Sequence, residues 1–196
     1  MDPATQVTEP TNRRLRTLLE THQKLLNPEL LRPARGAVLI EQNEIADSLL
    51  LVQQGRLAVE MQQIGHGART IAEVGTGAVL GEMALFGMGD PRHGARVRVL
   101  DANTEILRFS RKTLHSAVLF DAELAAEMLL VSSERCRNSN RMINMLLDGI
   151  DATARGDASA LADICNTLRN GPESMREAAA QLEQLLTLAA PRRPRH

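Results

Sequence analysis

A glycine, a glutamate and an arginine lie close enough in the sequence to form a site for a sugar phosphate. Gly81-Glu82 opens a helix-compatible segment, and Arg92 follows ten residues later. Glycine lets the backbone approach a ligand closely, and backbone N–H groups at the start of a helical turn favour an anion. A carboxylate accepts hydrogen bonds from ribose hydroxyls, while a guanidinium pairs with phosphate. These residue types at this spacing indicate a nucleotide monophosphate as ligand.

The rest of the sequence offers no comparable cluster for catalysis or metal binding. The five histidines are scattered, and neither Cys136 nor Cys165 lies in a CxxC or CxxH spacing. Both cysteines fall in helical patterns with Leu and Ile, so we expect small core residues and neither zinc ligands nor a disulfide. We therefore expect a binding protein without cofactor or metal, and not an enzyme.

The composition is that of an aliphatic globular protein with no overall attraction for nucleic acid. Of the 196 residues, 43% are hydrophobic and 24% are charged, and the net charge is −1. With three Phe, no Tyr and no Trp, the core must be aliphatic, and bases have few rings on which to stack. No apolar run is long enough for a signal peptide or a membrane span, so we expect a cytoplasmic protein.

Residues 37–109 have the pattern of a small all-β domain, and this domain would hold the Gly-Glu-Arg cluster. Short apolar runs are separated by Gly, Asn and Asp. Apolar and polar residues alternate over 57–61 and 96–99, as in half-buried strands. His66-Gly67 predicts a hairpin turn. The pattern predicts a sandwich or barrel of short strands.

Helical patterns flank this β region. Leucines between 15 and 26 recur at helical spacing, and Asn27-Pro28-Glu29 predicts the start of a further helical turn through Leu31. After Phe109, Ser110 is placed to cap a short helix. A long helix is then expected from Asp121 to about Leu147, with Asp148-Gly149 as its end.

One face of this long helix has a four-three spacing that resembles a coiled-coil seam with a polar middle. Its members are Leu124, Met128, Val131, Arg135, Asn138, Met142 and Met145. Two shorter helices are expected beyond it, the first capped by Asp157 and ended by Asn170-Gly171, the second started by Pro172-Glu173. Residues 150–190 hold six acidic and three basic residues and no β-wing pattern, which argues against a helix that faces phosphates.

Residues 81–92 resemble the phosphate-binding cassette of cyclic-nucleotide-binding domains. The shared order is Gly-Glu, a hydrophobic residue, Ala-Leu-Phe, a loop with Gly and Pro, and then Arg. Residues 43–61, NEIADSLLLVQQGRLAVEM, resemble the stretch that precedes this cassette in the family. The family includes the bacterial catabolite activator proteins and the regulatory subunits of cyclic-AMP-dependent kinase. The resemblance covers about residues 30–147.

The resemblance implies a mainly β fold with α: an eight-stranded jelly roll flanked by N-terminal helices, a long C-terminal helix and two short helices. The domains that we expect are a disordered tail (1–11), the β-roll with its N-terminal helices (12–120), a long lid or dimerisation helix (121–148), a helical extension (149–190) and a basic tail (191–196).

The resemblance also implies a site for cyclic AMP or cyclic GMP. In it, Glu82 holds the ribose 2′-OH, Arg92 neutralises the cyclic phosphate, and Gly81 and Ala84 approach through the backbone. The full set of expected ligand residues is Gly81, Glu82, Met83, Ala84, Arg92, His93 and Ala95. Arg135 and Asn138, or the neighbouring Ser139, contact the base or each other across a homodimer built through 121–148. The open alternative is that they face water.

Three functions remain open at this stage. The first is a cyclic-nucleotide sensor that signals through an unknown protein partner or a dimer change. The second is a β-roll interaction module that no longer binds a nucleotide, which is favoured by the stretch after Arg92 being one residue longer than in the family. The third is a transcription regulator of the catabolite activator type. The C-terminal helices favour a protein partner, and we expect no sequence-specific DNA binding and no membrane span.

Overall fold

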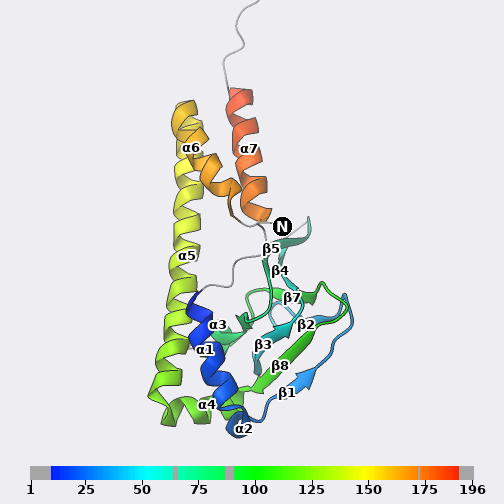
Figure 1. Cartoon of the computed structure of the whole chain (residues 1–196). Coiled ribbons are helices and arrows are strands. Elements are labelled where there is room, and N and C mark those ends of the chain that lie inside the picture. Colours follow the sequence, from blue (N-terminus) through cyan, green and yellow to red (C-terminus); the bar gives the residue numbers. More distant parts are fainter. Residues whose placement is uncertain (1–9, 64–65, 87–90, 172, 190–196) are drawn as a thin grey trace, which may run out of the picture. The chain divides into compact units, whose positions relative to one another are not determined.

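The computed structural model describes residues 10–63, 66–86, 91–171 and 173–189 (Figure 1). The chain divides into two compact units, Met1–Glu134 and Arg135–His196, with the boundary inside the long helix. Of the expected tails, residues 1–9 and 191–196 lie outside the described residues, and the first helix begins at Pro10.

The first unit contains two antiparallel sheets of four strands each. The strand order is β1-β8-β3-β6 in one sheet and β2-β7-β4-β5 in the other. This confirms the expected eight-stranded roll. The strands are β1 (Glu29–Leu31), β2 (Val38–Ile40), β3 (Ser48–Gln54), β4 (Leu57–Gln63), β5 (His66–Val74), β6 (Val79–Leu80), β7 (Arg96–Val99) and β8 (Glu105–Ser110).

Strand β3 is buried on both faces, which explains its unbroken apolar sequence. Leu50 and Val52 point into the core between the two sheets. Leu49 and Leu51 point the other way, into a second core under the helices. All four side chains are at most 1% exposed. Because successive residues of a strand face opposite sides, one strand contributes to both cores.

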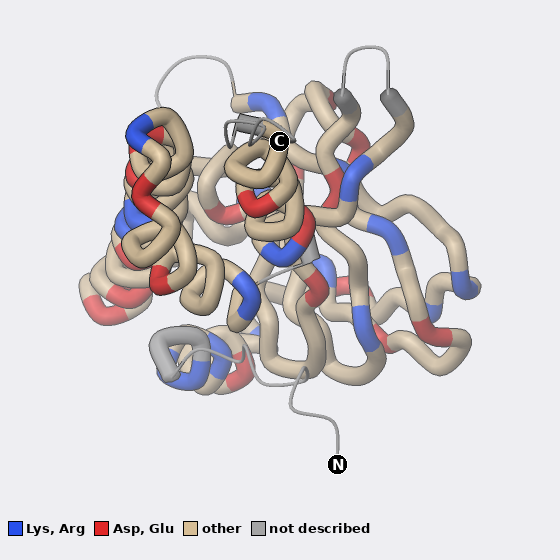
Figure 2. Tube along the Cα trace, turned by 90° about the horizontal axis from the view of Figure 1, so that it is seen from above, with Lys and Arg blue, Asp and Glu red and all other residues tan. Residues whose placement is uncertain are grey.

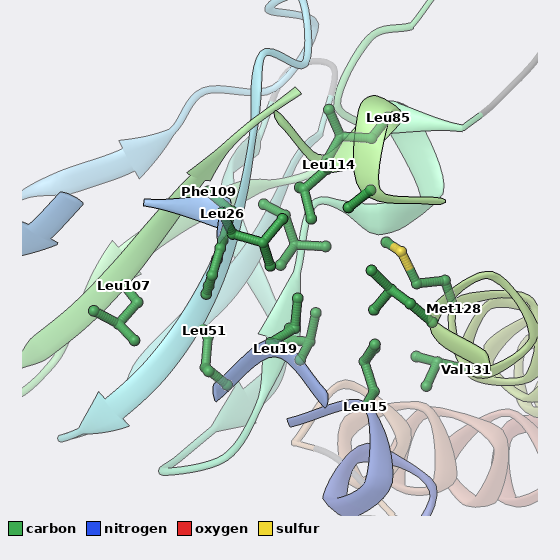
Figure 3. Close-up of a cluster of buried hydrophobic side chains, with 14 of the residues drawn as sticks. Leu15, Leu19, Leu26, Leu51, Leu85, Leu107, Phe109, Leu114, Met128 and Val131 are labelled. Carbon is green, nitrogen blue, oxygen red and sulfur yellow. The ribbon is translucent and has the colours of Figure 1, made fainter. Parts of the chain in front are cut away.

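Helices cover the outer face of the β1-β8-β3-β6 sheet. They are α1 (Pro10–Thr21), α2 (Gln23–Leu26), α4 (Arg111–Phe120) and the first turns of α5 (Ala122–Arg155). Figure 3 shows their side chains facing those of the strands. The expected cap of α4 is confirmed, because Ser110 accepts a hydrogen bond of 3.2 Å from the N–H of Thr113. The buried cluster includes Leu15, Leu19, Leu26, Leu51, Leu107, Phe109, Leu114, Leu124, Met128 and Val131.

Two turn predictions were wrong. Asn27 does not open a helical turn. It ends α2 with a left-handed φ of 41°, its N–H donates to the carbonyl of Gln23, and Glu29–Leu31 pair with β8 as β1. Asparagine tolerates this conformation and proline often follows a helix end, so the same residues fit an end as well as a start. His66-Gly67 begin β5, and the residues between β4 and β5 lie outside the described chain.

The seam predicted on the long helix is not a free surface. Leu124, Met128 and Val131 are buried in the core of the first unit, and Met145 packs against the core of the second. The four-three spacing records packing within each unit. An intramolecular face and a dimer face have the same spacing, so the sequence pattern does not distinguish them.

The second unit consists of the rest of α5 with α6 (Ala158–Arg169) and α7 (Glu173–Ala189), which form a helical hairpin (Figure 1). Its small core includes Ala152, Leu161, Cys165, Leu168, Ala179 and Leu182. Cys165 is therefore a core residue as expected, whereas Cys136 is exposed, contrary to prediction. The expected cap of α6 is confirmed by a 3.0 Å hydrogen bond from the N–H of Ala160 to Asp157.

The long helix continues past its predicted end at Asp148-Gly149 and stops at Arg155. Gly149 lies inside the helix, and its Cα, which carries no side chain, faces the other two helices. A Cβ on Gly149 would lie 2.7 Å from Cδ1 of Leu182 and 3.5 Å from Cγ2 of Ile164. The glycine thus serves close packing. The helix ends before Gly156, whose φ of 68° suits a helix terminus.

Candidate functional site

Gly81 follows the end of strand β6, and its conformation and surroundings both require glycine. Its φ is +94°, in the left-handed region, and it precedes the one-turn helix α3 (Glu82–Leu85). A Cβ on Gly81 would lie 2.8 Å from the carbonyl oxygen of Ser48. This distance is too short for a carbon atom, so the backbone of the β6–α3 turn passes directly against β3.

The side chains of helix α3 differ in burial, and some face the core while others face solvent. Glu82 and Leu85 are buried, with exposed fractions of 1% and 0%. Ala84 packs partly against the core under the helices, whereas Met83 is exposed. Glu82 thus holds a carboxylate where the dielectric constant is low, and a hydrogen bond to this carboxylate gains strength there.

The chain returns to this region as an extended arm, residues 91–93, which pairs with residues 43–46. The N–H of Ala46 donates to the carbonyl of Pro91 at 2.7 Å, and the N–H of Asn43 donates to that of His93 at 2.8 Å. The N–H of His93 donates in turn to the carbonyl of Glu44 at 2.9 Å. These bonds fix the arm by its backbone, whatever its side chains are.

The guanidinium of Arg92 is held at the backbone of the opposite segment. Its Nη1 donates to the carbonyl oxygen of Asn43 at 2.7 Å, and the side chain is exposed. Asn43 itself has a left-handed φ of 69°. Asparagine adopts this conformation at little cost, which turns its carbonyl toward the arm.

The imidazole of His93 lies against Gly81. His93 is 8% exposed, and a Cβ on Gly81 would be 3.6 Å from its Cε1 atom. Burial lowers the pKa of His93, because a cation loses hydration there, while the charges of Asp47 and Glu44 act in the opposite direction. The ring is therefore neutral at pH 7 and occupies the space beside the glycine.

The structure brings together some of the predicted ligand residues. Gly81 and His93 lie side by side in space. The guanidinium of Arg92 is held by its bond to Asn43, and Ala95 is half-buried just before β7. The sequence pattern did not single out Glu44 and Asp47 as neighbours of this site. The signal for them was present, because both lie in the segment 43–61 that resembles the family.

The three residues expected near the base belong to the second unit. Arg135 is half-buried, and Asn138 and Ser139 are exposed, all on α5. Their contact with a nucleotide stays a prediction.

The described residues hold neither a metal cluster nor a membrane-spanning helix. No three His, Cys, Asp or Glu side chains of residues 10–63, 66–86, 91–171 and 173–189 come together as metal ligands would. None of the helices described there combines the length and apolar character needed to span a bilayer.

The first unit combines a jelly roll of two four-stranded sheets with a glycine turn after β6 and an arginine arm before β7. Residues 31–119 match the family model of the cyclic nucleotide-binding domain. The match covers the folded roll and confirms the resemblance drawn from residues 43–61 and 81–92. A comparison with curated proteins finds no match.

Solved structures with the same fold include bacterial regulators. The catabolite activator protein of Thermus thermophilus is 19% identical, with 96% of this chain and 87% of that chain covered and a TM-score of 0.59. A transcriptional regulator from Thermotoga maritima is 21% identical, with 62% and 93% covered and a TM-score of 0.55. A cyclic nucleotide-binding domain from Methylobacillus flagellatus is 28% identical, with 60% and 67% covered and a TM-score of 0.50.

Proposed function

We propose that the chain is a sensor of cyclic AMP or cyclic GMP that signals through a protein partner or a change of dimer and catalyses no reaction. The observation that carries the proposal is the family match over 31–119, which coincides with the folded roll. A ligand of this class carries an anionic phosphate and a free ribose hydroxyl, and the chain offers a group for each.

In this proposal the nucleotide lies along the turn after β6. Gly81 and Ala84 approach it through the backbone, and the buried carboxylate of Glu82 accepts a hydrogen bond from the ribose 2′-OH. Met83 and Ala95 border the site. Arg92 exchanges its bond to the Asn43 carbonyl for the phosphate. Charge-assisted pairing with phosphate is stronger than a bond to a neutral carbonyl, so the exchange is favourable.

His93 has to respond to the ligand because its ring occupies the space beside Gly81. A neutral imidazole there either swings out or takes a second proton and donates to the phosphate. Binding of an anion raises the pKa of a neighbouring histidine, so proton uptake accompanies the second path. Nucleotide binding should then strengthen as the pH falls.

A second candidate function also rests on His93. With a neutral ring beside Gly81 and Arg92 bonded to the backbone, the roll is self-contained without a nucleotide. A chain that keeps this arrangement is an interaction module whose pocket no longer takes a ligand. Failure of both nucleotides to bind would leave this function as the better account.

The proposed dimer uses a different face of α5 from the one that the sequence predicted. We define the α5 stripe by five exposed residues of the second unit, whose spacing alternates between four and three: Cys136, Asn140, Ile143, Leu147 and Ile150. Ile143, Leu147 and Ile150 are each more than half exposed.

This spacing is that of a two-stranded coiled coil, and a single asparagine among apolar seam positions fixes register in such pairs. Asn140 holds that place in the α5 stripe. A large apolar surface that stays exposed marks an interaction site, so we assign the α5 stripe to a second copy of the chain.

The second unit is proposed to dock a protein partner. Figure 2 shows acidic residues among the basic ones along the described chain, with no extended region of basic charge there. A DNA-reading helix needs several cations toward phosphates, and the excess of acids in 150–190 opposes this. The third function, a transcription regulator, draws on the fold likeness to the Thermus thermophilus protein. A gel-shift titration that found a sharp sequence preference would favour this third function.

Calorimetry on the full chain with cyclic AMP and cyclic GMP tests the sensor. We expect saturable binding and stabilisation of about 2.7 kcal/mol at a hundredfold excess of ligand over Kd. Arg92→Ala should abolish the stabilisation. Arg32→Ala is the matched control, because Arg32 is an exposed arginine that pairs with Glu105 on the same roll. Absence of binding with both nucleotides at millimolar concentration would refute the sensor.

A further inference from the structure

The first unit has a hollow away from the proposed nucleotide site, and none of the predicted ligand residues lines it. It has a volume of about 720 Å³ and lies between α2, α4 and the first residues of α5. This volume is in the range of small-molecule sites, about 300–1,000 Å³. We call it the α2–α4 cavity.

Large apolar side chains stand at the α2–α4 cavity without being covered. Leu25 is 71% exposed and Phe120 is 91% exposed, although both line the cavity. Ala117 is buried at its wall. A ligand with an apolar body would remove these side chains from water, and the free energy gained grows with the apolar area covered.

The one acidic side chain that lines the α2–α4 cavity, Asp121, already has partners within the protein. Asp121 lies 2.7 Å from Nε2 of His22, and its Oδ1 accepts hydrogen bonds from the N–H groups of Leu124 and Glu123, both at 2.9 Å. The backbone bond from Leu124 is the main cause that lowers the pKa of Asp121. The carboxylate is ionised and engaged.

The cation of the α2–α4 cavity is Lys112, and no acidic side chain of the described residues forms an ion pair with it. It sits in the first turn of α4, where a helix dipole disfavours positive charge. An anion beside Lys112 would offset this cost. The hydroxyl of the neighbouring Ser116 already donates to the carbonyl of Lys112 at 3.1 Å, so the ammonium is the donor left for a ligand.

We propose that the α2–α4 cavity binds a small amphipathic monocarboxylate, with its carboxylate at Lys112 and its aliphatic part between Leu25 and Phe120. One ammonium suits one carboxylate, whereas a phosphate calls for several donors or a guanidinium fork. The site spans α2 and the corner between α4 and α5, which the His22–Asp121 pair already joins. A ligand here would therefore stabilise that corner. The inference does not depend on cyclic-nucleotide binding.

The test uses octanoate as the probe, on the full chain, with octanol as its uncharged counterpart. We expect octanoate to bind saturably by calorimetry and to raise Tm. Lys112→Gln should weaken octanoate about tenfold and leave octanol unchanged, because it removes the charge and keeps most of the length of the side chain. Lys24→Gln is the matched control, since Lys24 is the other lysine of the chain, is exposed on α2 and does not line the cavity.

A second variant addresses the apolar part. Leu25→Asn should weaken octanoate and octanol alike, and the fold should survive because Leu25 is mostly exposed. Arg92→Ala should leave octanoate binding unchanged, which separates this site from the nucleotide site. Absence of saturable binding, or an equal effect of Lys112→Gln and Lys24→Gln, would overturn the proposal.

Discussion

The two units use a glycine in a crowded place in opposite ways. Gly81 in the roll faces a backbone oxygen at 2.8 Å from its missing Cβ, whereas Gly149 in the helical unit faces a leucine methyl at 2.7 Å. A carbonyl in a sheet is held by its hydrogen bonds and has little room to move, while a leucine end changes rotamer. The roll therefore positions its ligand groups by rigid backbone, and the helical unit relies on adaptable side chains.

The largest effect should come from Gly81→Ala. The new Cβ meets the Ser48 carbonyl and also forces an alanine into a left-handed conformation, so we expect a loss of about 3 kcal/mol in the free energy of unfolding, measured in urea. Gly36→Ala separates the two causes. Gly36 has a φ of +86° with open space around it, so only the conformational cost of about 1 kcal/mol remains. An equal loss in the free energy of unfolding in the two variants would show that the backbone around residue 81 shifts to accommodate the new Cβ.

The next effect concerns the helical unit and the α5 stripe. Ile143→Asp places a charge in the proposed seam, and burying an unpaired carboxylate should weaken the dimer at least about a hundredfold. Light scattering across a dilution series measures this. Leu188→Asp on α7 is the control, because Leu188 is 74% exposed and lies off the α5 stripe. A dimer unaffected by Ile143→Asp would remove α5 as the interface.

A smaller effect is expected from Gly149→Ala. Alanine gains about 1 kcal/mol of helix propensity over glycine, and displacement of Leu182 costs about as much or slightly more. The net change in stability should stay within about 1 kcal/mol. A double-mutant cycle with Leu182→Ala checks the cause, because truncation of Leu182 should cost less when the added methyl group at position 149 already fills part of its space. Additive effects would contradict the adaptable packing of this unit.

The smallest effect is a pH dependence of stability that His93 gives to the roll. The pKa of His93 in the folded protein is lowered from its usual 6.5, so the unfolded chain binds more protons than the folded one. Stability is then fully present above pH 6.5 and is lost as the pH falls from 6.5 through the lowered pKa. Urea unfolding between about pH 7.5 and 5 should show this slope, and His93→Gln should flatten it. An unchanged slope would place the titration elsewhere.

Nucleotide affinity should have the opposite slope if His93 donates to the phosphate. Calorimetry with cyclic AMP at about pH 7.5 and about pH 6 should then show tighter binding at the lower pH, with proton uptake. The same pair of measurements on His93→Gln should agree with each other. Equal affinity at both pH values in the unaltered chain would indicate that the ring leaves the site on binding.

The roll could be predicted from the sequence because its local signals agree with its tertiary structure. Alternation over 57–61, the cap at Ser110 and the cassette order each pointed to the observed element. The errors arose where one pattern has two structural outcomes. Asn27-Pro28 suits the end of a helix as well as the start, and Gly149 serves close packing as well as termination. The buried seam of α5 had the spacing of a dimer interface.

The candidate site was predicted only as a set of residues. Sequence spacing placed Gly81, Glu82 and Arg92 in one cassette, but it did not predict that Arg92 bonds to the Asn43 carbonyl or that His93 lies against Gly81. These contacts arise from pairing between the arm 91–93 and residues 43–46, which are almost fifty positions apart. Such long-range register is set by the whole roll and leaves little trace in a local motif.

The leucines of β3 have a consequence for how the first unit melts. Since Leu50 and Val52 belong to one core while Leu49 and Leu51 belong to the other, neither layer can open without removing a wall of its neighbour. The roll and its covering helices should therefore unfold as a single cooperative block, with the β3 amides exchanging hydrogen only in the globally unfolded chain. Gly81 directly follows Leu80, which pairs with Leu50. A substitution that strains the turn at Gly81 should therefore lower the stability of the entire block.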